Sequence, residues 1–172
     1  MATKTARQTR QDLLGPYLND HLAGATAGVS LARRMVASAA PGSERATALT
    51  RLAAEITEDR SALLRIMVAL GVQVRGYKVF AAWAGEKAGR LKLNGRLLRR
   101  SPLSDLEETE FLWLGVQGKT AGWRALRELA DSDSRLDAGR LDHLLARADR
   151  QASALETLRS SAAEHALTTD SS

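Results

Sequence analysis

The sequence places histidine and carboxylate residues, whose side chains can bind metals or exchange protons, at helical spacing. A core seam in a helix advances by alternating steps of three and four residues. One such seam runs through Leu14, Leu18, His21, Ala25, Gly28, Ala32 and Met35. A second runs through Leu49, Leu52, Ile56, Asp59, Leu63, Ile66 and Leu70. Each seam therefore carries one ionisable side chain among apolar ones.

The two seams predict that His21 and Asp59 meet inside the protein. Folding the two segments about a turn near residues 40–42 places His21 opposite Asp59 or one turn away from it. Because an unpaired buried charge costs several kcal/mol, we expect a direct contact between these two side chains. Glu55 precedes Asp59 by one helical turn and can join the pair.

A single divalent transition-metal ion, such as Fe, Mn or Zn, is the second interpretation of this site. Its ligands would be His21, Glu55, Asp59 and Glu110, because acids of the third helical segment enter the seam at about this level. Imidazole and carboxylate groups are ordinary ligands for such ions. The sequence favours the plain hydrogen-bonded His21–Asp59 pair over the metal site. It assigns no catalytic residue and no other cofactor.

Glycines in helical segments predict close packing. Gly24 and Gly28 would let the second helix or the crossover pack tightly beside His21, or they are simply tolerated as small core residues. The stretch GVQGKT (115–120) resembles part of a phosphate loop, but the glycine that such a loop needs five residues before Gly118 is missing. We expect instead that Gly115 and Gly118 pack against the aromatic crossover segment and that Lys119 lies at the surface.

The composition predicts one all-α domain. The chain has 172 residues, 44% of them apolar, which suffices for one core. Alanine, leucine and arginine dominate and favour helices, while the excess of arginine over lysine is typical of a GC-rich bacterial genome. The absence of cysteine excludes disulfides and thiolate chemistry. With no signal-like or membrane-spanning run, a cytoplasmic location is expected.

Four long helices are expected, at about 16–39, 43–70, 101–130 and 136–164. Ser43 is predicted to cap the second, Gly71 to end it, and Ser104 with Glu107 to form a capping box in the third. The short loops predict two antiparallel hairpins. The domain would span residues 12–165, between a disordered basic arm (1–11) and a disordered tail (166–172).

Residues 71–102 form a long crossover, in which YKVFAAWAGEKAG predicts a short fifth helix. Two hairpins joined by one long crossover resemble the ferritin-like bundles, and the first hairpin (16–71) also resembles them in its acidic and histidine seam residues. The resemblance implies a di-iron centre held by Glu-x-x-His motifs. No Glu-x-x-His occurs in this chain, so a complete di-iron centre is not expected.

A basic patch lies in the crossover and consists of Lys87, Arg90, Lys92, Arg96, Arg99 and Arg100. It would hold phosphates of a nucleic acid without reading sequence, because aromatic stacking partners precede it instead of interleaving with it. The alternative, which we favour, pairs these cations with acids of neighbouring helices.

The function expected from these features is non-catalytic. We expect a ferritin-like helical protein that acts by self-association, as a homodimer, or by binding a protein partner. The apolar cluster FLWL (111–114) is wider than one seam needs, which predicts a dimer surface, although it could equally pack under the crossover helix. A metal-dependent redox or storage protein is the first alternative, and nucleic-acid binding through residues 87–100 is the second.

Overall fold

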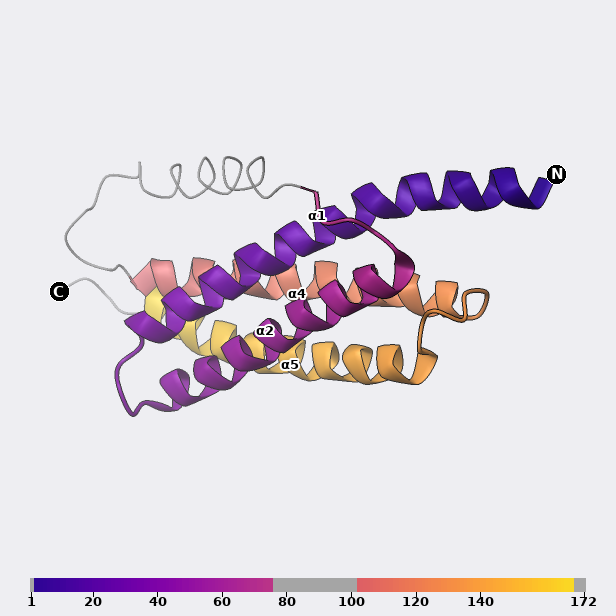
Figure 1. Cartoon of the computed structure of the whole chain (residues 1–172). Helices are drawn as coiled ribbons and strands as arrows, with labels where there is room; N and C mark the ends of the chain where they lie inside the picture. The colour runs from indigo at the N-terminus through magenta and orange to yellow at the C-terminus, as the bar shows by residue number, and fades with distance from the viewer. Residues whose placement is uncertain (1, 76–101, 169–172) are drawn as a thin grey trace.

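Four long helices make up the part of the chain that the structure describes. In this computed structural model, residues 2–75 and 102–168 are described, with side chains for 13–75 and 103–168. The helices are α1 (Ala2–Ser38), α2 (Glu44–Leu70), α4 (Pro102–Ala130) and α5 (Ala138–Thr168) (Figure 1). These ranges contain no strand, which confirms the all-α prediction. None of the described helices combines the length and the apolarity needed to cross a bilayer.

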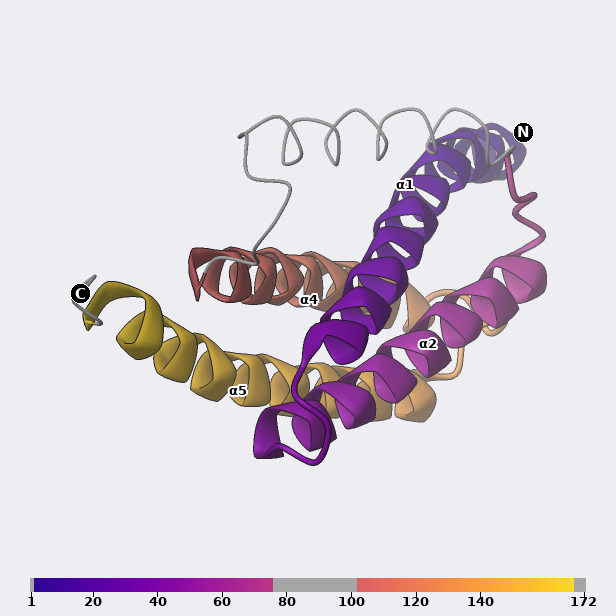
Figure 2. The ribbon, with the colours of Figure 1, turned by 90° about the vertical axis from the view of Figure 1, so that its left-hand side faces the viewer.

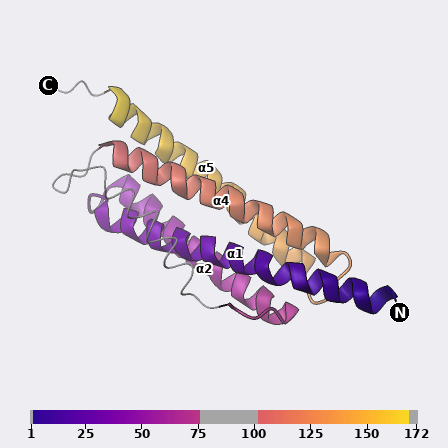
Figure 3. The same ribbon diagram turned by 90° about the horizontal axis from the view of Figure 1, so that it is seen from above.

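The helices form a bundle in which each one has two neighbours. α1 lies beside α2 and α4, and α5 lies beside α4 and α2, so that α2 and α4 are diagonally opposite (Figure 2). α1 and α2 run antiparallel, as do α4 and α5 (Figure 3). Of the four neighbouring pairs, α2 and α5 approach each other least extensively.

Both ends of α2 follow the predicted capping chemistry. The Ser43 side chain accepts a hydrogen bond from the Ala46 amide at 3.0 Å. Gly71 adopts a left-handed conformation with φ of 71°, and the Val72 amide donates to the Met67 carbonyl at 2.9 Å. This is the Schellman arrangement that glycine favours at a helix end.

The starts of the other helices differ from the prediction. α1 begins at Ala2, so residues 2–11 are helical where a disordered arm was expected, and Pro16 lies inside the helix. Alanine, arginine, lysine and glutamine in these first residues favour the helix. α4 begins at Pro102, which suits the first turn because proline lacks an amide hydrogen; Ser104 is therefore not its cap. Asp137 caps α5 and accepts from the Arg140 amide at 3.0 Å.

The seam predicted for α2 is confirmed, because all seven of its residues are buried. In α1 the seam is shifted in the middle of the helix. Leu22 and Val29 are buried there, at 6% and 8% exposure, whereas His21 and Gly28 are only partly buried. Leu22 and Val29 offer more apolar surface than the neighbouring small residues, and the helix turns them inward.

The crossover predictions lie outside the described residues. The short fifth helix and all six members of the basic patch fall within 76–101. In the predicted tail, α5 continues to Thr168, so residues 166–168 are helical instead of disordered.

Candidate functional site

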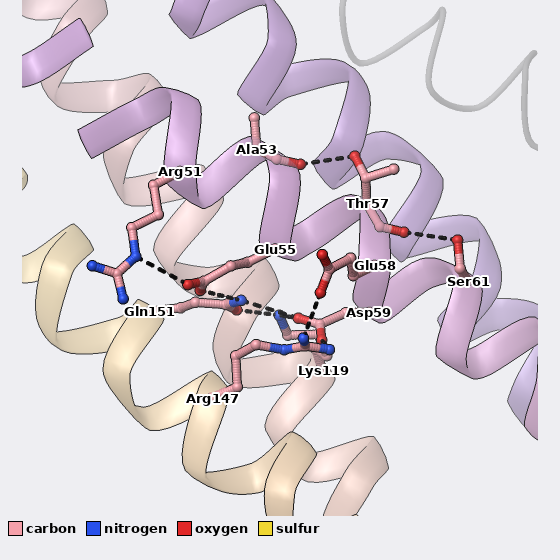
Figure 4. Close-up of polar contacts among 10 residues, drawn as sticks. All are labelled: Arg51, Ala53, Glu55, Thr57, Glu58, Asp59, Ser61, Lys119, Arg147 and Gln151. Atoms are coloured by element: carbon pink, nitrogen blue, oxygen red, sulfur yellow. Dashed lines mark hydrogen bonds and ion pairs between the residues drawn. The ribbon is translucent and has the colours of Figure 1, made fainter. Parts of the chain in front are cut away.

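Asp59 is the centre of a polar cluster inside the bundle. Its side chain is 1% exposed, and its carboxylate contacts a cation from each of the two helices of the other hairpin (Figure 4). Lys119 Nζ of α4 donates to Asp59 Oδ2 at 2.5 Å. Arg147 Nη2 of α5 forms an ion pair with Asp59 Oδ1. The prediction that Asp59 is a buried, paired residue is thus confirmed, with partners other than the expected one.

Gln151 of α5 joins the parts of this cluster. Its amide nitrogen donates to Asp59 Oδ2 and to Glu55 Oε2, at 3.1 Å each, and its amide oxygen accepts from Lys119 Nζ. Gln151 is 1% exposed, and a buried amide needs hydrogen-bond partners at both its nitrogen and its oxygen. These contacts supply them. Glu55 therefore lies in the cluster, as predicted, although it reaches Asp59 through Gln151.

The outer side of the cluster is closed by two further ion pairs. Arg147 Nη1 donates to Glu58 Oε2 at 2.8 Å, and Arg51 Nε donates to Glu55 Oε1 at 3.2 Å. Three cationic side chains therefore face three carboxylates, and the formal charges cancel. Because low-dielectric surroundings strengthen both attraction and the penalty for unpaired charge, the contacts of buried Asp59 and Gln151 favour one arrangement of α2, α4 and α5.

Burial lowers the pKa of the Lys119 ammonium below its ordinary value, and the nearby Arg147 charge acts in the same direction. The Asp59 carboxylate opposes this shift through its charge and its hydrogen bond. Lys119 is 12% exposed and tied to both Asp59 and Gln151. A side chain held in this way is arranged to bind its neighbours, and its nitrogen is not directed at a free reactant.

His21 does not contact Asp59, which corrects the predicted pair. Its ring lies against Gly122 of α4: a Cβ atom added to that glycine would lie 2.9 Å from His21 Nδ1. The ring also makes an edge-to-face contact with Tyr17, with 4.5 Å between centroids. Burial lowers the pKa of His21, and the charge of Asp20 partly opposes that shift.

Among the described residues, Gly24 and Gly28 do not act as the expected spacers beside His21. Within the described residues, an added Cβ at Gly24 meets nothing within 4 Å, and one at Gly28 would make only an ordinary contact at 3.9 Å with Ile56. The close approach to His21 comes instead from Gly122. α1 therefore packs closely against α4 where the His21 ring contacts the backbone of Gly122.

The four predicted metal ligands are not brought together. Among the described residues, no group of three or more His, Asp or Glu side chains is placed to hold a metal ion. Asp59 faces Lys119 and Arg147, His21 faces Gly122, and exposed Glu110 lies 4.0 Å from Arg159. Lys119 and Arg147 contact the two Asp59 carboxylate oxygens that a metal ion would have to bind.

Lys119, Arg147 and Gln151 were missed as site residues. Two of them lie on core seams that the spacing could have revealed. Lys119 aligns with Leu112, Val116, Trp123 and Leu126. Gln151 aligns with Leu141, Leu144, Ala148 and Leu155. Lys119 was expected at the surface because Gly115 and Gly118 were expected to form the packed face of this stretch; it lies on the inner seam of α4 instead. Arg147 neighbours the seam and reaches inward along its aliphatic stem.

The remaining histidines lie on the surface. His143 and His165 of α5 are both exposed.

Comparisons of the chain with protein-family models, with curated proteins and with solved structures each found no match.

Proposed function

We propose that this protein is a non-catalytic, ferritin-like helical protein that acts by self-association, with the outward face of α4 as its dimer surface. The antiparallel pairs α1–α2 and α4–α5, with α2 and α4 running in the same direction, support the ferritin-like connectivity (Figure 1). The balanced charges around Asp59 support a structural role for the buried cluster.

The dimer surface is carried by a second seam on α4. Its inner seam, through Leu112 and Trp123, faces the core. A second run at steps of three and four residues is exposed and contains no charged residue; it consists of Phe111, Leu114, Gly118, Ala121 and Ala125. Phe111 and Leu114 are 52% and 57% exposed, which is unusual for such large apolar side chains.

The order of residues along this outer seam favours a second copy of the chain as the partner. Large side chains occupy its first half and small ones its second half. A two-fold axis near Gly118 would set α4 antiparallel to its copy, so that Phe111 and Leu114 of one chain pack over Ala121 and Ala125 of the other. This self-complementary order of large and small residues is the observation that carries the proposal.

Sedimentation or light scattering tests the proposal, with twice the 18.6 kDa chain mass as the expected result. Phe111→Glu with Leu114→Glu should give monomers, whereas Val68→Glu, at a still more exposed apolar residue of α2, should not. Because the chain has no cysteine, a single Gly118→Cys substitution should oxidise to a covalent dimer. A wild-type protein that is monomeric at all concentrations would contradict the proposal.

Metal binding stays a prediction of the sequence, although its expected ligands His21, Glu55, Asp59 and Glu110 do not meet among the described residues. Elemental analysis of protein purified without chelator tests it directly. Bound Fe, Mn or Zn that disappears in Asp59→Asn would support it.

A further inference from the structure

A groove of about 610 Å³ lies between α2 and α5, the least extensively packed pair of neighbouring helices. Its α2 wall includes the small residues Ser61 and Ala62, and its α5 wall includes Ala146. The volume is in the range of small-molecule sites. This groove is formed by different helices from the proposed dimer surface and is independent of it.

The lining of the groove is strongly basic. Its ionisable residues are Arg65 of α2, then Arg140, His143, Arg147 and Arg150 of α5, with Glu58 as the single acid. The α5 residues follow one another at steps of three, four and three, so they form one stripe along the helix. A groove with this charge attracts anions.

Three of these arginines are available to a ligand. Arg147 is held by Glu58 and Asp59. Among the described residues, Arg65, Arg140 and Arg150 form no ion pair, and Arg150 only donates to the Ala146 carbonyl of its own helix at 3.2 Å. Arginine presents a planar fork of donors that matches phosphate oxygens.

The spacing of the arginines favours an extended anion over a compact one. Arg140 and Arg150 are separated by ten residues, which corresponds to roughly 15 Å along the helix axis. A chain of linked phosphates can follow this stripe and engage more of its arginines than a single phosphate group can. We propose that the groove between α2 and α5 binds a small anion carrying several linked phosphate groups, through Arg65, Arg140 and Arg150.

Calorimetric titration of the full chain with inorganic tripolyphosphate tests this site. At matched ionic strength, tripolyphosphate should bind at least about tenfold more tightly than orthophosphate, because it engages more than one arginine. Arg140→Gln with Arg150→Gln should weaken tripolyphosphate binding by at least about tenfold. Arg33→Gln with Arg124→Gln removes the same charge from exposed residues outside the groove and should leave the affinity nearly unchanged.

Three results would overturn the proposal. The first is tripolyphosphate affinity that is equal in the Arg140→Gln, Arg150→Gln variant and in the wild type, with both folded by circular dichroism. The second is loss of binding only on charge reversal at Arg96, Arg99 and Arg100, which would move the site to the basic patch. The third is binding of a single-stranded oligonucleotide without binding of tripolyphosphate. Binding of ATP like tripolyphosphate would support the site and identify a nucleotide as one source of the phosphates.

Discussion

Lys119 Nζ lies 2.5 Å from Asp59 Oδ2 and so joins α4 to α2, the two helices that are diagonally opposite in the bundle. The contact runs through the interior, where Asp59 is 1% exposed. An ion pair at this position holds the two hairpins in one register, since sliding either helix by a turn would separate the charges.

We expect Lys119→Met to lower the free energy of unfolding by about 2 to 4 kcal/mol, because the Asp59 carboxylate would stay buried with one cation fewer. Arg147 and Gln151 remain as partners of Asp59, which keeps the loss below that of a fully orphaned charge. Urea denaturation measures this loss in the free energy of unfolding. Combining Lys119→Met with Asp59→Leu should recover part of the loss, since the buried carboxylate is removed while Arg147 and Gln151 lose a partner.

The matched control for this prediction is Arg159→Met. It breaks an ion pair in which the Arg159 side chain is 34% exposed and the Glu156 side chain 52% exposed, and ion pairs at such accessible positions contribute little to stability. The loss should be much smaller than that of Lys119→Met. Equal losses in the two variants would show that the buried pair has no special role.

Much of the fold follows from local chemistry that a sequence displays. Ser43 and Gly71 bound α2 through side-chain and backbone preferences, and these were predicted correctly. The seam of α2 was also predictable, because its large apolar residues repeat without interruption. The seam of α1 was not, because alanines and glycines around His21 leave several faces of similar apolarity.

The partners of Asp59 were harder to predict than its burial. Pairing within one hairpin can be deduced from a short turn, and that reasoning suggested His21. Lys119 and Gln151 belong to the other hairpin, beyond a long crossover, so their register against α2 depends on the packing of all four helices. A search for every polar residue on a core seam would have found both, since charges in a core must be paired.

Gly122→Ala should destabilise the protein through its contact with His21. The new Cβ would lie 2.9 Å from His21 Nδ1 and Cε1, so the imidazole, which also contacts Tyr17, would have to move. Overpacking of about 1 to 3 kcal/mol exceeds the gain of up to about 1 kcal/mol in helix propensity. We expect a net loss of about 1 to 2 kcal/mol, measured by urea denaturation.

Gly24→Ala is the control for that substitution. Nothing in the described residues lies within 4 Å of its added Cβ, so the change should stabilise α1 by about 0.5 to 1 kcal/mol. Adding His21→Ala to Gly122→Ala should relieve the crowding. Stabilisation by Gly122→Ala alone would show that the histidine and the glycine are not in close contact.

Acidification should destabilise the protein in part through His21. Burial lowers its pKa in the folded state below the ordinary value of 6.5, so the unfolded chain binds the proton more readily. The unfolding free energy therefore has its full His21 contribution above pH 6.5 and loses it as the pH falls through the lowered pKa. Urea midpoints between pH 7.5 and 5 should thus fall less in His21→Gln than in the wild type. A His21→Gln curve that parallels the wild type over this range would mean that the imidazole is as accessible to protons in the folded chain as in the unfolded one.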